Sequence, residues 1–301
     1  MPGHALDQAG AGSAARPELL RRLFDDASLF PPASLSMAAA VAGHGRHSVA
    51  WYAPLAGPFV CQDTRLAELG AVLTAAGVLG IDVSVIVTAG ATAVTAAMDA
   101  VVADPRLRLR ALEVPAAISA ADDPEQAIGV IAEALDAAAL AGAAAYIEMP
   151  PQVIGGRAER LLAIVADRGY RLKLRTGGAS PEAFPDEATL AACLAALAGG
   201  RVRFKCTAGL HHAVRHTAAD TGFEHHGFLN LLLAVGAADA GASLDQVTAV
   251  LAEREPAAVA EQVRAIDADE AERIRALVVS VGTCSTDEPV SDLLGLGLVS
   301  R

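Results

Sequence analysis

The chain contains almost no lysine. Of its 23 basic residues only Lys173 and Lys205 are lysines, and all the others are arginines. Such usage in an alanine-rich chain is typical of GC-rich bacterial genomes. A guanidinium stays protonated whereas an amine can lose its proton, so a lysine kept in this chain is a candidate for chemistry that arginine cannot perform.

Cysteine is also scarce, and no two cysteines are close in the sequence. The chain has Cys61, Cys193, Cys206 and Cys284, with no CxxC pair among them. This spacing argues against a disulfide framework and a structural zinc site, and it favours a reducing compartment.

Signals for nucleic acid, secretion and membranes are missing. The net charge is −12 and no block of consecutive basic residues offsets it, so nucleic-acid binding is not expected. The first 20 residues lack the basic and apolar regions of a secretory signal, and no uncharged run of about 18 residues occurs. We therefore expect a cytoplasmic protein without a membrane contact. Assembly into a homo-oligomer stays open.

Short apolar or β-branched runs alternate with longer stretches of helical spacing. The strand candidates are residues 48–53, 82–88, 107–114, 144–149, 171–176, 202–207 and 277–282, and a long helical tract covers 226–275. This alternation predicts a parallel sheet with right-handed crossovers. With seven candidates we predict an α/β fold, a (β/α)8 TIM-type barrel with one atypical or missing strand. An open doubly wound parallel sheet is the alternative.

No linker rich in glycine, proline or serine divides the chain. We predict a flexible N-terminus over residues 1–17 and a single α/β barrel domain over 18–301. Segment 24–41, which contains a Pro-Pro turn, is interpreted as a lid or plug on one end of the barrel. Its Asp25 and Asp26 are interpreted as solvated or helix-capping acids, with catalysis as the alternative.

Charged residues recur on one side of three neighbouring strand candidates. Alternate side chains of a barrel strand pack under the helices, and the others point into the barrel. The inward set comprises Tyr146, Glu148, Lys173, Arg175, Arg203, Lys205 and Thr207. Catalytic groups of this fold lie at the carboxyl ends of the strands, so we expect a site there. An internal salt-bridge network is the structural alternative.

Lys205 is the predicted nucleophile. In this interpretation it lies with Lys173, Arg175 and Arg203 against a single carboxylate, that of Glu148. Burial and like charge both lower the pKa of an amine. A neutral lysine can form a Schiff base with a carbonyl substrate, and Glu148 is the candidate that moves protons.

The run FKCTAG, which contains Lys205, resembles the Schiff-base strand of class I aldolases of the deoxyribose-phosphate aldolase type. In that family a lysine near the end of a sixth strand precedes hydroxyl residues and glycine, and Lys205, Thr207 and Gly209 match. The resemblance implies a carbinolamine and an imine at Lys205. It covers about six residues of the chain, and the residues after Gly209 differ. The family's second lysine, on the following strand, has no counterpart among the strand candidates.

Histidine is concentrated in one segment, which holds His211, His212, His216, His225 and His226. We expect His211 and His212 to act as acid or base, and His225 and His226 to bind the substrate. A zinc or iron site with Glu148 as a further ligand is the alternative, although the spacing lacks HxH and HExxH. A polar loop that caps the next helix is the structural alternative. Asn230, the only asparagine, is a candidate for orienting a ligand.

Two glycine runs follow strand candidates, and each offers backbone N–H groups to an anion. The candidates for substrate binding are Gly177 and Gly178 in RTGG, and Gly282 and Ser285 in GTCS. Tight turns are the structural alternative. Neither run is a Walker or dinucleotide fingerprint, so we expect no nucleotide cofactor, and the favoured interpretation assigns no metal.

These patterns favour a carbon–carbon lyase, or a related Schiff-base enzyme, that acts on a small anionic carbonyl compound carrying a phosphate or carboxylate. A metal-dependent hydrolase or isomerase built on the histidines is the first alternative. A non-catalytic binding protein with a barrel fold is the second, because the fold by itself does not decide function.

Overall fold

A computed structural model describes residues 17–116, 123–155 and 158–301. The predicted flexible N-terminus, residues 1–17, lies outside these ranges except for its last residue. Within the described ranges, no helix combines the length and the apolar character needed to cross a membrane.

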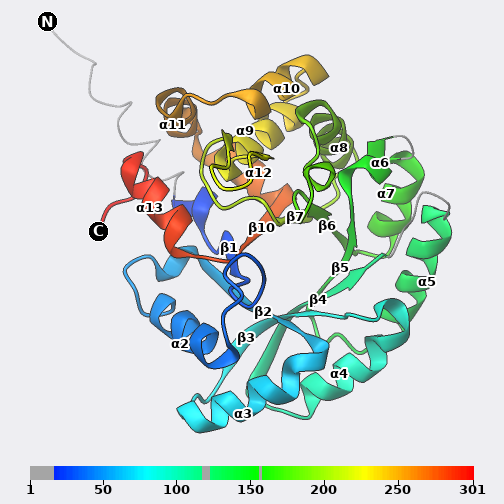
Figure 1. Cartoon of the computed structure of the whole chain (residues 1–301). Helices are drawn as coiled ribbons and strands as arrows, with labels where there is room; N and C mark the ends of the chain where they lie inside the picture. Colours follow the sequence, from blue (N-terminus) through cyan, green and yellow to red (C-terminus); the bar gives the residue numbers. More distant parts are fainter. Residues whose placement is uncertain (1–16, 117–122, 156–157) are drawn as a thin grey trace, which may run out of the picture.

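Eight parallel strands close into a barrel that is surrounded by helices (Figure 1). They are β1 (Phe24–Asp26), β2 (Ala56–Gln62), β3 (Ile81–Ile86), β4 (Leu107–Pro115), β5 (Ala144–Met149), β6 (Arg171–Arg175), β7 (Phe204–Thr207) and β10 (Val278–Thr283). The barrel closes because β1 pairs with both β2 and β10. The (β/α)8 TIM-type prediction is confirmed, and the open doubly wound sheet is wrong.

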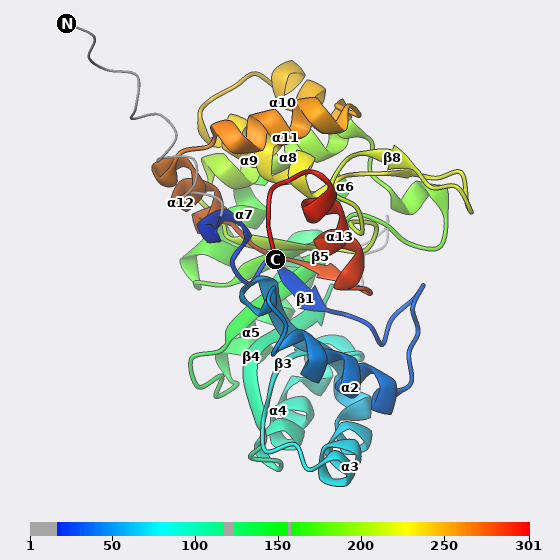
Figure 2. The ribbon, with the colours of Figure 1, turned by 90° about the vertical axis from the view of Figure 1, so that its left-hand side faces the viewer.

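Figure 1 shows helices following one another around the outside of the strands. The helices are α2 (Met37–His47), α3 (Leu66–Ala76), α4 (Val94–Val102), α5 (Pro124–Asp136), α6 (Pro151–Gly155), α7 (Ala158–Asp167), α8 (Glu187–Gly199), α9 (Phe228–Asp239), α10 (Leu244–Ala252), α11 (Pro256–Ala265), α12 (Ala268–Leu277) and α13 (Asp287–Gly295). In Figure 2, α10 and α11 lie at the top of the molecule and α3 and α4 at the bottom. A small antiparallel sheet of β8 (His216–Thr217) and β9 (Glu224–His225) lies in the segment between β7 and α9.

The predicted helical tract over 226–275 is divided into α9, α10, α11 and α12. Gly241, with φ +81°, follows α9, and Ser243 caps α10 by accepting a hydrogen bond from the backbone N–H of Gln246. Pro256 is the first residue of α11, and Asp267 caps α12. Each break therefore has a local cause, a left-handed glycine, a proline or a capping side chain.

The strand that the sequence analysis lacked is β1, inside the segment interpreted as a lid. Asp25 and Asp26 are only 3% and 4% exposed, so their interpretation as solvated acids is wrong. Phe24 packs edge-on against Phe228 of α9, with ring centroids 5.1 Å apart. Because β1 has three residues, of which two are acids, it shows neither β propensity nor a period of two.

Residues 48–53 form no strand, and β2 begins later, at Ala56. Gly57 and Pro58 concealed it, because both residue types are depleted in strands. Gly57 is needed here, since a Cβ at this position would clash with the Asp25 side chain and lie 3.0 Å from the Phe24 carbonyl oxygen. The glycine lets β1 and β2 approach each other.

Including β1 changes the strand numbers of the two lysines. Lys173 lies on the sixth barrel strand, and Lys205 lies on the seventh rather than the sixth. The two residues are partners in the β6–β7 register. The predicted alternation is correct here, because Leu172, Leu174 and Phe204 are fully buried on the outer side of the strands while both lysines point inward.

Candidate functional site

An ionic cluster lies inside the barrel. Its six side chains come from five strands and are Asp25, Glu113, Glu148, Lys173, Arg175 and Lys205. Three carboxylates face three cations, so the charges balance within the cluster. Only Arg175 reaches solvent to a large extent, with 52% of its side chain exposed.

Glu113 of β4 connects the two lysines. Its Oε1 accepts a hydrogen bond from Lys205 Nζ at 2.6 Å and another from Ser84 Oγ. Its Oε2 lies 2.7 Å from Lys173 Nζ. Burial raises the pKa of a carboxyl, but the charges of Lys173 and Lys205 outweigh burial and hold the pKa of Glu113 well below its usual value. Glu113 is therefore an ionised group without access to water.

Lys205 is held as an ammonium. Its Nζ donates to Asp25 Oδ2 at 2.5 Å as well as to Glu113, and Ser280 Oγ donates to the same Asp25 oxygen at 2.8 Å. Burial by itself would lower the pKa of Lys205, but the two carboxylates outweigh burial and raise it. The predicted lowering of this pKa is wrong. Arg203, an expected neighbour, precedes β7 and lines the same opening as Lys205, but the groups in direct contact with the Lys205 amine are carboxylates.

Lys173 lies nearer the carboxyl ends of the strands. Its Nζ is 2.7 Å from Glu113 Oε2 and 2.9 Å from Glu148 Oε2, and Arg175 Nε donates to Glu148 Oε1 at 3.1 Å. Glu113 Oε2 receives no well-directed hydrogen bond from the residues that the structure describes. The contact between Lys173 and Glu113 is thus an ion pair that is less well directed than the hydrogen bonds of Lys205.

Asp25 and Glu113 are the two carboxylates of the cluster that the sequence analysis did not assign to it. Their presence removes the predicted excess of four cations over one carboxylate. The alternation in LRLRALEVP could have revealed Glu113, which stands between the outward-facing Leu112 and Val114. Asp25 had no comparable signal, because its strand was not recognised.

The two glycine runs lie where strand ends approach each other. A Cβ on Gly177 would lie 3.0 Å from Gly209, and a Cβ on Gly282 would lie 3.1 Å from Thr207 Oγ1. Close packing therefore requires glycine at position 177 and leaves little room for a Cβ at position 282. Gly178 is exposed, and binding of an anion at these turns stays a prediction.

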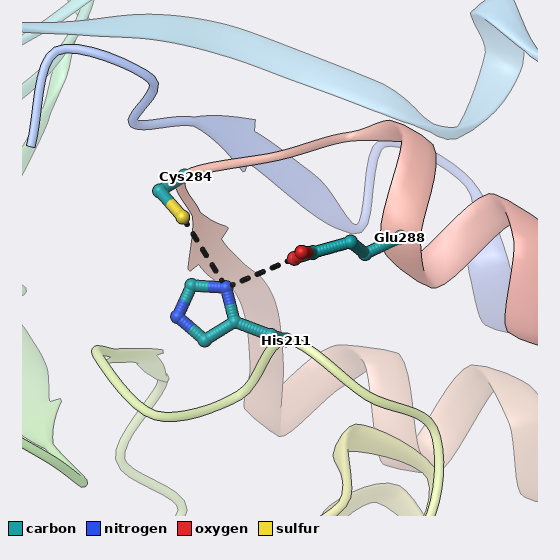
Figure 3. A group of neighbouring side chains, drawn as sticks. All are labelled: His211, Cys284 and Glu288. Carbon is teal, nitrogen blue, oxygen red and sulfur yellow. Dashed lines mark hydrogen bonds and ion pairs between the residues drawn. The ribbon is translucent and has the colours of Figure 1, made fainter. Parts of the chain in front are cut away.

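The five clustered histidines do not form one site. His211 alone lies beside Cys284, which follows β10, and Glu288, which lies in the first turn of α13 (Figure 3). His211 Nδ1 is 3.4 Å from Cys284 Sγ and 3.4 Å from Glu288 Oε2. Burial lowers the pKa of His211, which favours the neutral imidazole that binds metals. Ser285, a predicted substrate-binding residue, follows Cys284 in the chain. Its Oγ accepts a hydrogen bond from the backbone N–H of Glu288 at 3.4 Å.

These three side chains fit a metal ion by their chemistry. Their ligand atoms all lie within 4.8 Å of one another. An imidazole, a thiol and a carboxylate are the donors that Zn²⁺ prefers. Glu148, the ligand expected from the sequence, contacts Lys173 and Arg175 instead, so the predicted combination of Glu148 with the histidines is wrong.

Three further histidines lie around the β8–β9 hairpin. His212 Nδ1 is 3.1 Å from Asp292 Oδ2, and its ring packs edge-on against that of His216 at 4.7 Å. His216 pairs with His225 across the hairpin. His212, His216 and Asp292 line a cavity of about 480 Å³ together with Arg254. The two residues of the predicted catalytic pair thus contact different carboxylates of the same helix, His211 that of Glu288 and His212 that of Asp292, both in α13.

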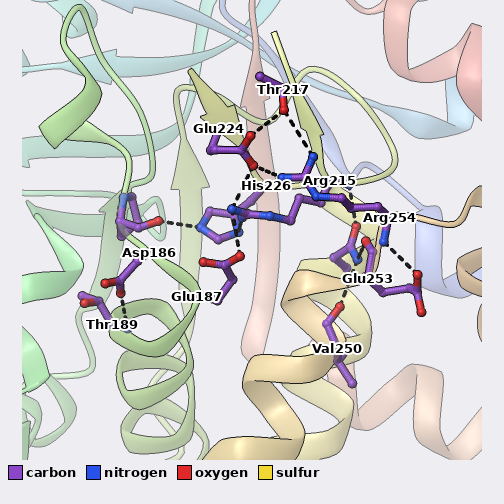
Figure 4. A network of polar contacts seen from close by, with 12 residues as sticks. Asp186, Glu187, Thr189, Arg215, Thr217, Glu224, His226, Val250, Glu253 and Arg254 are labelled. Carbon is purple, nitrogen blue, oxygen red and sulfur yellow. Dashed lines mark hydrogen bonds and ion pairs between the residues drawn. The ribbon is translucent and has the colours of Figure 1, made fainter. Parts of the chain in front are cut away.

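His226 and Asn230 are buried and bind other parts of the chain. Figure 4 shows His226 beside Arg215. His226 Nε2 donates to the Pro185 carbonyl at 2.8 Å, and its Nδ1 accepts from Arg215 Nη1 at 3.2 Å. Asn230 accepts from the Arg215 backbone N–H and donates to two carbonyls at the end of α10. These contacts occupy the polar atoms of both side chains, so we assign them a structural role rather than the expected substrate contact.

No family model matches the chain, and no curated protein matches it significantly. A TIM-type barrel hosts many different activities, so any assignment of function depends on the geometry of the site.

Proposed function

We propose that the protein is a carbon–carbon lyase, or a related enzyme, that forms a Schiff base between a lysine and a small anionic carbonyl compound. One observation carries this proposal. The only two lysines of the chain meet at one buried carboxylate, with Glu113 2.6 Å from Lys205 Nζ and 2.7 Å from Lys173 Nζ. An arginine can serve in a buried ion pair, but it cannot form an imine.

The contacts favour Lys173 over Lys205 as the nucleophile. Lys205 donates to two carboxylates, and it lines an opening at the amino ends of the strands. Lys173 contacts Glu148, and Glu148 binds the half-exposed Arg175, at the end where enzymes of this fold bind substrates. The corrected strand numbers agree with this choice. In the aldolases that the FKCTAG run resembles, the Schiff-base lysine is on the sixth strand, which carries Lys173 here, although the run itself contains Lys205 of the seventh strand.

Imine formation at Lys173 can proceed with the groups that contact it. Lys173 Nζ gives a proton to Glu148 Oε2, 2.9 Å away, and the neutral amine attacks the carbonyl carbon. The carbinolamine hydroxyl takes that proton from Glu148 and leaves as water, and a protonated imine remains. The bond that then breaks joins the carbon next to the imine carbon to the hydroxyl-bearing carbon beyond it. Its electron pair moves toward the protonated imine, which becomes an enamine, and the hydroxyl gives its proton to Glu148 as its carbon becomes the carbonyl of the released product. Arg175 is exposed enough to bind the anionic group of the substrate.

Reductive trapping tests the proposal. The protein is incubated with glyoxylate, pyruvate, dihydroxyacetone phosphate or glyceraldehyde 3-phosphate in the presence of borohydride, and its peptides are analysed by mass spectrometry. We expect a covalent adduct on the peptide that contains Lys173. With only two lysines in the chain, each lysine-containing peptide identifies its residue.

Two matched variants complete this experiment. Lys173→Arg keeps the charge and should abolish the adduct, whereas Lys205→Arg should keep it. If the adduct instead forms at Lys205 and is lost in Lys205→Arg, Lys205 is the nucleophile. The Schiff-base mechanism would then still hold, with the other lysine. If no compound of the set gives an adduct at either lysine, the Schiff-base proposal is wrong.

A second candidate function rests on His211, Cys284 and Glu288, whose ligand atoms converge at the carboxyl end of β10. We propose as the alternative a hydrolase or isomerase in which these residues bind Zn²⁺ and leave a fourth position for water or substrate. Titration with Zn²⁺ followed by calorimetry should then give one site per chain. His211→Ala should remove that site, while the adjacent His212→Ala should keep it. Equal binding by both variants would contradict this alternative.

A further inference from the structure

The opening of the barrel at the amino ends of its strands is unusually rich in arginine. It encloses about 440 Å³, and its basic lining consists of Arg21, Arg22, Arg110, Arg171, Arg203, Arg275 and Lys205. Asp25 is the one acidic residue of the lining, and it is already bound to Lys205 and Ser280. The chain has a net charge of −12, so this concentration of cations requires a local explanation.

Several strands contribute an arginine at their beginning. Arg171 is the first residue of β6, Arg203 directly precedes β7, and Arg110 lies in the first half of β4. Arg22 precedes β1, and Arg275 lies in the last turn of α12, just before β10. In a closed parallel barrel the amino ends of all strands meet at the same mouth, so these side chains converge.

Half of these arginines have a carboxylate partner. Arg22 and Arg110 bind Asp82, and Arg21 binds Glu18. The hydrogen bonds from Arg110 and Arg108 outweigh burial and lower the pKa of Asp82 to about 2. The charges of Arg21, Arg22 and Arg110 are therefore compensated within the protein, and we assign these residues a structural role.

The other three have no carboxylate within ion-pairing distance in the part of the chain that the structure describes. Arg171 Nη1 donates to Tyr146 Oη at 3.2 Å. Arg275 donates to the carbonyls of Arg21 and Val279, while its Nη1 is buried without a partner. Arg203 has no hydrogen-bond partner among the described residues.

Three unpaired guanidinium groups at one mouth repel one another. Burial together with the charge of Arg171 lowers the pKa of Arg203, and burial lowers the pKa of Arg275 to about 10. Both groups stay protonated at neutral pH, and the attraction of Glu18 and Asp25 does not outweigh the burial of the Arg275 charge. A bound anion would relieve this repulsion and provide acceptors for the free N–H groups.

We propose that the arginine mouth, defined by Arg171, Arg203 and Arg275, binds a small polyanion whose charged groups are phosphates or carboxylates. The planar guanidinium donates paired hydrogen bonds to either group, and three of them match a ligand with at least two anionic groups. The enclosed volume lies in the range of about 300–1,000 Å³ that is typical of small-molecule sites. The site lies opposite the carboxyl ends of the strands, so it is separate from the proposed lyase chemistry.

Calorimetry with two probes, inorganic tripolyphosphate and citrate, tests this site. We expect wild type to bind at least one of them with one site per chain, and the preferred probe tells phosphate from carboxylate chemistry. Arg171→Gln/Arg203→Gln should weaken binding at least tenfold, because two charge-assisted contacts are lost. Arg168→Gln is the matched control, since this exposed arginine binds Asp136 outside the barrel, and it should bind as wild type does.

A second measurement does not depend on the folding of a variant. Phenylglyoxal modifies accessible arginines, and mass spectrometry locates the modified residues. Tripolyphosphate or citrate should protect Arg203 and Arg171 of wild type but leave Arg168 unprotected. The site is disproved if neither probe binds, or if the double variant binds as tightly as wild type. Equal protection of all three arginines would also overturn it.

Discussion

Lys173 and Lys205 are paired in register on adjacent strands, and their amines contact opposite oxygens of a single carboxylate, that of Glu113. Glu113 is therefore the common counterion of both lysines. If Lys173 loses its proton during a reaction, Glu113 keeps its contact with the ammonium of Lys205. A proton can therefore move from Lys173 to Glu148 within the cluster without leaving the buried Glu113 carboxylate unpaired.

Removal of the common carboxylate should destabilise the protein strongly. We expect Glu113→Gln to lower the free energy of unfolding by about 3–5 kcal/mol, because two buried ammonium groups lose a counterion at once. Glu148→Gln is the control and should cost less, since its partner Arg175 is half exposed and can be hydrated. Unfolding in urea measures both variants, and equal losses would contradict the central position of Glu113.

The close approach of β1 and β2 should depend on Gly57. Gly57→Ala should destabilise by about 1–3 kcal/mol, because its Cβ would meet the Asp25 side chain and the Phe24 carbonyl. Gly45→Ala, in the exposed face of α2 with no atom within 4 Å, should stabilise by about 0.5–1 kcal/mol. Thermal unfolding of the two variants distinguishes them by the sign of the change in Tm.

Acidification should destabilise the fold through His226. Burial lowers the pKa of His226 below its unfolded value of about 6.5, and the neutral ring uses Nδ1 to accept from Arg215. The unfolded chain therefore binds the proton more readily, so stability is present above about pH 6.5 and falls as pH decreases through that value. Unfolding curves between pH 7.5 and 5 measure this slope. His226→Gln should show a shallower slope than wild type, and an unchanged slope would refute the assignment.

Thiol reagents should react slowly with the native protein. All four cysteines are buried. Burial raises the pKa of Cys61 to about 12 and raises that of Cys284 as well, so few thiolates are present at neutral pH. We expect four equivalents of reagent to react after unfolding and none rapidly before it. A rapid reaction of the folded protein with the reagent would contradict this expectation. If Cys284→Ser abolished that reaction, reagent would be reaching the Cys284 thiol beside His211.

Alternation along single strands was predictable, because it is a local property of the extended backbone. It placed Lys173 and Lys205 inside the barrel, and the same rule applied to β4 would have placed Glu113 there. Gly57 and Pro58 concealed β2 in the sequence, since local propensity opposes a strand that the packing of Asp25 requires. The count of strands, and with it the position of each lysine in the barrel, depended on that packing.

The sequence by itself determined the fold class and the inward direction of both lysines. It also singled out these two positions, because every other basic residue of the chain is an arginine. Only the tertiary structure decided that these lysines are paired with carboxylates. Lys205 is 180 positions from Asp25 and 92 from Glu113, and closure of the barrel brings the three together. No local pattern encodes such a contact. The sign of the Lys205 pKa shift follows from it, because charge and burial at one atom depend on all the strands that surround it.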